Sequence, residues 1–156
     1  MGTESRLSDA GLLIREAAGL WHDPIAAELR LLRALEIEPD SEDALIALYR
    51  FLFYRGERER ALDLARQCVG RAGVELGLAA DWRTVNADGI DFGDPERPRH
   101  RFYLFALNAY GYLLARLGRN EEAEAALAAV RRLDPADRIG GARLLAVLKR
   151  GPDEDE

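Results

Sequence analysis

Few side chains in this sequence are of the types that carry out covalent or metal chemistry. The chain has two histidines, His22 and His100, and a single cysteine, Cys68. Neither histidine has a second ligand at a spacing typical of a metal site, and no histidine or helix start is placed to activate the thiol. We therefore interpret all three residues as structural and expect Cys68 to be buried.

Four acidic residues, Asp88, Asp91, Asp94 and Glu96, lie close together in the sequence. Calcium-binding loops have aspartates at alternate positions before a glycine and a glutamate at the end, and this order is absent here. The sequence also lacks a phosphate-binding glycine motif, a nucleophile elbow and a dinucleotide-binding fingerprint. We therefore predict no catalytic residue, no metal ligand and no cofactor, which argues against an enzyme.

Composition and charge favour a small globular protein that binds neither nucleic acid nor membranes. The 156 residues suit one domain, and 48% apolar with 32% charged residues is typical of a folded, highly soluble chain. The formal net charge is -6, and the sequence has no excess of lysine and arginine for binding nucleic acid or anionic lipid. A single cysteine, no signal-peptide pattern and no apolar run of roughly 20 residues predict a cytoplasmic protein.

The elements that would position a site are helices, and the clearest pair lies in residues 101–135. Apolar residues recur there at intervals of three and four, which places them on one face of each helix. Gly118 can end the first helix in a left-handed conformation, and Asn120 can cap the second. Small residues at Gly111 and Ala123 predict close antiparallel packing. The apolar positions are Leu104, Leu107, Tyr110, Gly111 and Leu114 in the first helix and Ala123, Ala126, Leu127, Val130 and Leu133 in the second.

The order of large, small and proline positions in this segment resembles the tetratricopeptide repeat (TPR), a helix-turn-helix unit of about 34 residues. The resemblance implies an all-α fold, a right-handed superhelical stack of antiparallel helix hairpins. The matching positions are Leu107, Tyr110, Gly111, Leu114, Ala123, Leu127 and Pro135, while Val130 replaces the usual alanine. The expected organisation is a flexible N-terminus (1–7), repeats at about 8–41, 42–75 and 104–137, an inserted loop (76–103), a capping helix (138–150) and an acidic tail (151–156).

The first two repeats match this pattern less well. In the first, Asp23 can cap the second helix and Pro24 can occupy its first turn, but Arg15 stands where the family has a small residue. In the second, Tyr49 replaces the small residue of the first helix. The remaining matches are Ala27, Leu31, Ala34 and Pro39 in the first repeat and Leu45, Leu48, Leu52, Gly56, Ala61, Ala65 and Cys68 in the second.

The 28 residues before the third repeat are the most individual feature of the chain. Segments 82–85 and 90–92 flank an Asp88-Gly89 pair, so they can form a short hairpin or an ordered loop. Because Trp82 and Phe92 are large and apolar, we expect the insertion to pack against the helices.

In proteins that this chain resembles, the first helix of each repeat lines a concave groove that holds a peptide segment. The groove positions carry aromatic and arginine side chains, which dominate binding energy at many interfaces. The family's clamp for a terminal carboxylate is not expected, because Glu16 occupies one of its positions and only Asn108 is suggestive. The predicted contacts are Ile46, Arg50, Phe53 and Tyr54; Phe105, Asn108, Tyr112 and Arg116; Ala142, Arg143 and Lys149; and, from the insertion, Trp82 and Arg83. Alternatively, Trp82 or Phe92 fills the groove over Phe53, Phe105 and Tyr112.

The favoured function is a non-enzymatic scaffold or adaptor that binds a partner protein or peptide. One alternative is a dedicated client chaperone, because the chain resembles small acidic three-repeat chaperones of bacterial secretion systems. Another is an accessory or assembly protein for a metalloenzyme such as nitrogenase, because residues 82–85, 101–119 and 133–148 resemble small repeat proteins of bacterial nitrogen-fixation gene clusters. Self-association into a homo-oligomer is also compatible with the sequence, because a second copy can bury an exposed aromatic face.

Overall fold

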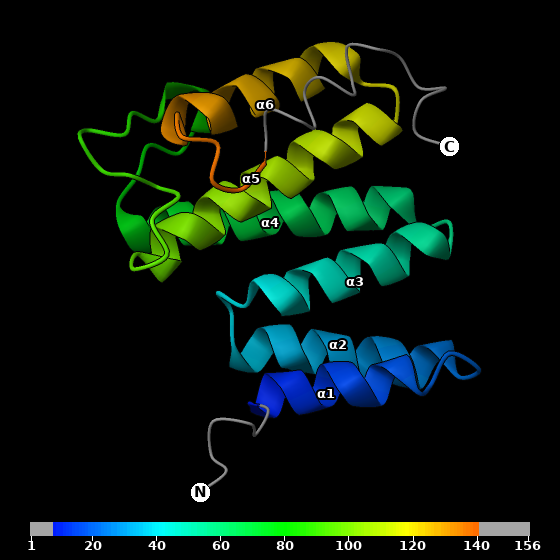
Figure 1. Ribbon diagram of the computed structural model, residues 1–156. Helices are drawn as coiled ribbons and strands as arrows, with labels where there is room; N and C mark the ends of the chain where they lie inside the picture. The colour runs from blue at the N-terminus through cyan, green and yellow to red at the C-terminus, as the bar shows by residue number, and fades with distance from the viewer. Residues whose placement is uncertain (1–7, 141–156) are drawn as a thin grey trace, which may run out of the picture. The chain divides into compact units, whose positions relative to one another are not determined.

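The computed structural model describes residues 8–140, which are helical or lie in turns and loops, without a strand (Figure 1). The predicted all-α class is therefore confirmed. The chain divides into two compact units, one up to Glu57 and one from Arg58. The first contains α1 (Asp9–Ala18), α2 (Pro24–Ile37) and α3 (Glu42–Tyr54), and the second contains α4 (Arg58–Leu76), η2 (Trp82–Thr84), α5 (Pro98–Arg116) and α6 (Asn120–Leu133). Between residues 8 and 140, no helix combines the length and apolar character needed to cross a bilayer.

The helices of the first unit begin at capping residues. Ser8, Asp23 and Ser41 each stand before a helix and accept a hydrogen bond from the backbone N–H three residues later, at 3.0, 3.2 and 3.0 Å. Pro24 occupies the first position of α2, where the missing N–H has no helical partner to lose. The predicted start of α2 at Asp23 and Pro24 is therefore confirmed.

Three alanines, one from each helix, lie together in the core of the first unit. Ala10 of α1, Ala34 of α2 and Ala44 of α3 are almost completely buried together, and partly buried leucine and isoleucine side chains pack around them. Since alanine has no side chain beyond Cβ, the three helices can approach closely at this point. The small residues that the sequence places here thus determine how tightly the unit packs.

In the second unit, α5 and α6 form the predicted antiparallel hairpin. Gly118 has a φ of 80°, the left-handed conformation expected at the end of α5. A Cβ atom built on Gly111 would lie 2.7 Å from Cδ2 of Leu127, so the small residue is required for the close approach. The prediction that Asn120 caps α6 is wrong, because α6 begins at Asn120 and Arg119 stands before it without a side-chain cap.

The other side of α5 packs on α4. Gly73 of α4 is buried, and a Cβ there would lie 3.4 Å from the ring of Tyr103 on α5. Cys68, also on α4, is buried as expected. Helix α5 begins at Pro98, six residues before the expected boundary at Leu104, so the inserted loop is shorter than predicted. A proline in the first turn of a helix loses no hydrogen bond, which accounts for this start.

The predicted domain organisation differs from the structure at one boundary and at the capping helix, and parts of it lie outside the described residues. The boundary between the two units falls after Glu57, inside the predicted repeat 42–75. Residues 138–140 form a turn and not the start of the predicted capping helix. The remainder of that helix, the acidic tail at 151–156 and the predicted N-terminal segment 1–7 lie outside residues 8–140.

Candidate functional site

An open cavity of about 560 Å³ lies between α1 and α3 in the first unit. Its volume falls in the range of ligand-binding pockets, roughly 300–1,000 Å³. Like such pockets, it combines apolar side chains with a small number of charged ones. The lining residues are Gly11, Ile14 and Arg15 from α1 and Asp43, Ile46, Ala47 and Arg50 from α3. We call this cavity the α1–α3 groove.

Two arginines give the groove its chemistry. Arg15 and Arg50 are both exposed, and neither forms an ion pair with an acidic residue within residues 8–140. The Arg50 guanidinium lies 5.9 Å from the ring centroid of Tyr54, a cation–π contact that leaves its N–H donors available. A guanidinium can bind a carboxylate through two parallel hydrogen bonds, so the groove can hold an acidic group over aliphatic side chains.

The charges are arranged along the groove. Helices α1 and α3 run in the same direction (Figure 1), and Asp43 precedes Arg50 by two helical turns, about 10 Å. Asp43 also lies in the first turn of α3, where a carboxylate stabilises the positive end of the helix dipole. One end of the groove is therefore acidic and the other basic, a polarity that can orient an extended segment.

The predicted contacts on α3 have different positions in the structure. Ile46 and Arg50, which the repeat pattern predicted as contacts, line the α1–α3 groove. Tyr54 is exposed beside Arg50, whereas Phe53 is only 8% exposed and packs within the protein. Phe53 therefore contributes to folding and offers little surface to a partner.

Sequence reasoning did not identify Arg15 as a site residue. The available signal was a large charged side chain at a position where the repeat family has a small one. In the structure, the guanidinium of Arg15 lies at the groove, where a small residue would have allowed the helices to contact each other.

The insertion packs on the side of α5 that faces away from the predicted binding residues. Trp82 makes an edge contact with Tyr110 at 6.2 Å between ring centroids, and Phe92 lies 6.0 Å from Tyr103. Successive residues of a helix differ by about 100°, so residues two positions apart point in nearly opposite directions. Phe105 and Tyr112, two positions after these tyrosines, therefore point away from the rings of Trp82 and Phe92. The alternative in which these rings fill the groove over Phe105 and Tyr112 is wrong.

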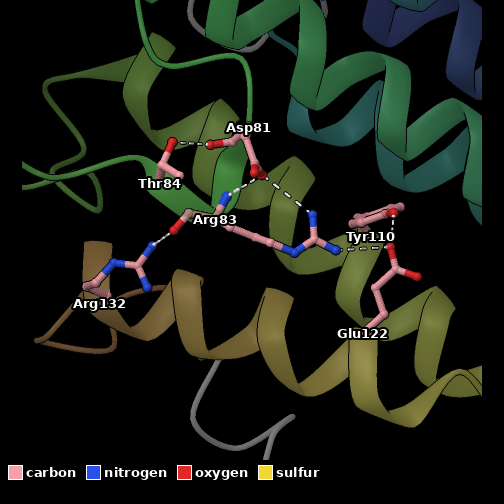
Figure 2. Close-up of polar contacts among 6 residues, drawn as sticks. All are labelled: Asp81, Arg83, Thr84, Tyr110, Glu122 and Arg132. Atoms are coloured by element: carbon pink, nitrogen blue, oxygen red, sulfur yellow. Dashed lines mark hydrogen bonds and ion pairs between the residues drawn. The ribbon is translucent and has the colours of Figure 1, made fainter.

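Polar contacts also hold the insertion against α5 and α6 (Figure 2). Arg83 pairs with Asp81 at 3.5 Å and with Glu122 at 3.7 Å, and its guanidinium stacks 4.3 Å from the Trp82 ring. The Tyr110 hydroxyl donates to Glu122 at 2.9 Å. Burial, followed by this hydrogen bond, raises the pKa of Tyr110. Trp82 and Arg83, predicted as partner contacts, thus have partners within the fold.

Arg132 completes this attachment from α6. Its Nη2 donates to the backbone oxygens of Arg83 and Val85, both at 3.3 Å. Val85 and Phe92 are buried, which confirms that the insertion packs on the helices. The short hairpin is not formed, because residues 82–84 adopt a 3-10 turn and no strand follows in the loop up to α5.

On the opposite side of α5, Asn108 has an unusual environment. Its Oδ1 atom is buried and has no hydrogen-bond partner in the described part of the chain, between residues 8 and 140. Phe105, Tyr112 and Arg116 are half-buried on the same side of the helix. Ala142, Arg143 and Lys149, the other predicted contacts, lie outside the described residues.

Comparison with known proteins identifies a relative but no described activity. No protein-family model matches the chain, and no solved structure matches it. The chain is 42% identical, over 124 residues, to an "Uncharacterized 19.8 kDa protein in nifW 5'region" of Azotobacter chroococcum mcd 1. The match covers 78% of this chain and 69% of that protein. The chain therefore belongs to the family of this Azotobacter protein.

Proposed function

We propose that the chain is a non-enzymatic adaptor of the TPR type, which acts in the cytoplasm and binds a segment of a partner protein in the α1–α3 groove. The observation that carries the proposal is the pair of arginines, Arg15 and Arg50, above an aliphatic surface. Neither has an acidic partner within residues 8–140, so both remain available for a ligand carboxylate.

The chemistry of the groove specifies the partner. Ile14, Ile46 and Ala47 favour aliphatic side chains, and the two guanidinium groups favour aspartate or glutamate. Asp43, at the other end, favours a basic residue about three positions away in an extended segment, since such a chain advances roughly 3.3 Å per residue. The ligand is thus an extended segment with aliphatic residues and an acidic residue at one end.

A second candidate function is that of an accessory or assembly protein for a metalloenzyme such as nitrogenase. The relative from Azotobacter is named for its position in the nifW 5' region, and nif denotes nitrogen-fixation genes. This function is compatible with an adaptor, because an assembly protein can act by binding one component. Proteins encoded near nifW are therefore the first partners to test.

The test measures binding of fluorescein-labelled peptides by fluorescence anisotropy with the full chain. The probes are aliphatic heptapeptides that end in two glutamates, in two glutamines or in two lysines. Arg15→Glu and Arg50→Glu should each weaken binding of the glutamate peptide at least about tenfold, because each places a like charge beside the ligand. Arg33→Glu is the matched control, since Arg33 is exposed on α2 and pairs with Glu36.

The glutamate peptide should bind more tightly than the glutamine peptide, and its affinity should fall with added salt. Equal affinities for the three peptides, or unchanged binding by both groove variants, would contradict a carboxylate site. The nitrogen-fixation role is tested separately by deleting the gene in a nitrogen-fixing strain that contains it and measuring acetylene reduction. Undiminished reduction would exclude that role and leave the peptide result unaffected.

A further inference from the structure

Helix α2 carries a line of large apolar side chains on its exposed side. Ile25, Leu29 and Leu32 follow one another at intervals of four and three residues, and their exposed fractions are 75%, 60% and 43%. Trp21, in the turn before α2, is four residues before Ile25 and is 80% exposed. This spacing places the helical members on one face of α2. We call these four residues the α2 stripe.

The stripe is separate from the side of α2 that forms the core. Ala27, Leu31 and Ala34 are buried against the other helices of the first unit. Leu29 and Leu31 are two residues apart and therefore point in nearly opposite directions. The core of this unit is complete without the stripe, so its exposure has no explanation in the packing of the unit itself.

The size of the stripe is close to that of an interface. Its four side chains expose on the order of 500 Å², within the range of about 300–600 Å² for the largest apolar patch on a typical monomer. Each partner contributes roughly 800 Å² to a standard interface, so the stripe alone would supply more than half of one side. Trp21 supplies the kind of large aromatic anchor that dominates binding energy at interfaces.

The charges beside the stripe are already paired within the chain. Arg33 binds Glu36 at 3.1 Å, and Arg30 binds Glu16 at 3.1 Å. Covering the apolar residues would therefore not bury either of these arginines without a partner. Because Arg30 and Arg33 are each paired with a glutamate, the stripe offers little free positive charge to an anionic membrane, which argues against a membrane as its occupant.

We propose that the α2 stripe is a homodimer interface, in which it packs antiparallel against the α2 stripe of a second copy. An apolar line on one helix is complementary to itself under a two-fold rotation, which brings Trp21 of one copy toward Leu32 of the other. Ile25 and Leu29 then lie near the centre of the contact. This inference does not depend on the α1–α3 groove, which is formed by α1 and α3.

Analytical ultracentrifugation of the full chain, from nanomolar to high micromolar concentration, tests the interface. The wild-type chain should change from 17.4 kDa to twice this mass as its concentration rises. Ile25→Glu and Leu29→Glu should each remain monomeric, because a dimer would bury their carboxylates near the two-fold axis. Val74→Glu is the matched control: Val74 is 81% exposed on α4, outside the stripe, and this variant should still dimerise.

Trp21 provides a second measurement in the unmodified chain. Its fluorescence should shift to shorter wavelength as the dimer forms, because the exposed ring becomes buried, and Leu29→Glu should abolish the shift. Circular dichroism should show the same helix content in all variants, since the substituted residues are exposed. A wild-type chain that stays monomeric at every concentration would overturn the proposal. So would a dimer that persists in both Ile25→Glu and Leu29→Glu.

Discussion

Gly111 of α5 lies directly against Leu127 of α6, and a Cβ at position 111 would be 2.7 Å from Cδ2 of that leucine. It would also lie 2.9 Å from Cγ of the same side chain and 3.4 Å from Cβ of Ala126. Since both helices are buried along this contact, the leucine has little room to move. The absence of a side chain at position 111 therefore sets the distance between α5 and α6.

Gly111→Ala should lower the free energy of unfolding despite the higher helix propensity of alanine. Overpacking in a well-packed core costs about 1–3 kcal/mol, whereas alanine gains at most about 1 kcal/mol over glycine in a helix. Gly70→Ala is the control, because Gly70 lies in α4 and a Cβ there would have no neighbour within 4 Å. Urea denaturation should show a lower free energy of unfolding for Gly111→Ala and a higher one for Gly70→Ala. Equal gains for both variants would contradict the close contact.

Leu127→Ala should destabilise the protein by roughly 2–5 kcal/mol, because Leu127 is completely buried and its removal leaves a cavity. In the double variant with Gly111→Ala, the new methyl group at position 111 enters the space that Leu127 has vacated. Gly111→Ala should therefore lower the free energy of unfolding less in the Leu127→Ala background than in the wild-type chain. A double-mutant cycle measured by urea denaturation checks this coupling, and strictly additive effects would show that the two positions do not compete for space.

The sequence was sufficient to predict that α5 and α6 pair closely, because helical spacing and residue size both act locally. Periodic leucines and alanines identify α5 and α6, Gly118 marks the turn between them, and the small residue Gly111 indicates a close approach. That Leu127 is the residue against Gly111 is known from the structure. The same reasoning located α2 through Asp23 and Pro24. It placed the start of α5 too late, since residues 98–103 precede the repeat pattern from which the helix was inferred.

The candidate sites were harder to predict, because exposure depends on which helices are neighbours. Ile25, Leu29 and Leu32 have the spacing of a core face, but the structure shows that all three are exposed. The position of Trp82 could not be predicted either. The sequence indicates that the insertion packs on helices, but it does not indicate which side of α5 the insertion contacts. Arg50, which the repeat register predicted as a contact, lines the α1–α3 groove.

The ionisation of Tyr103 should make stability depend on pH in the alkaline range. Burial raises the pKa of Tyr103 from the ordinary tyrosine value of 10.0 to about 12. Above pH 10 the unfolded chain loses this proton while the folded chain retains it, so the free energy of unfolding falls until about pH 12. Below pH 10 both states keep the proton, and Tyr103 contributes no slope.

Urea denaturation at pH values from 8 to 11.5 measures this dependence. The series covers values below pH 10, where Tyr103 contributes no slope, and values between pH 10 and the raised pKa of about 12. Tyr103→Phe should be less sensitive to alkali than the wild-type chain, because phenylalanine has no proton to lose. Tyr54→Phe is the control, as Tyr54 is exposed. The interpretation fails if Tyr103→Phe and the wild-type chain lose stability in parallel above pH 10.

Trp82→Ala should loosen the insertion more than Arg83→Ala does. The tryptophan ring packs on Tyr110, and losing such an aromatic contact costs about 0.5–1.5 kcal/mol beyond the loss of buried apolar area. The ion pairs of Arg83 are partly exposed and contribute about 0–1 kcal/mol. Limited proteolysis within residues 77–97 should therefore be fastest for Trp82→Ala. Faster cleavage of Arg83→Ala would show that the polar contacts dominate.

Asn108→Leu should leave the stability unchanged or raise it slightly. The buried Oδ1 atom of Asn108 has no hydrogen-bond partner within residues 8–140, so the folded chain bears the cost of removing this acceptor from water. Leucine has a similar shape and no acceptor, which removes that cost. Asn108→Ala, which also removes packing volume, separates the effect of the polar atom from that of size. Thermal unfolding should give the order Leu, wild type, Ala from most to least stable. A loss of more than about 2 kcal/mol in Asn108→Leu would mean that the amide makes a hydrogen bond essential to the fold.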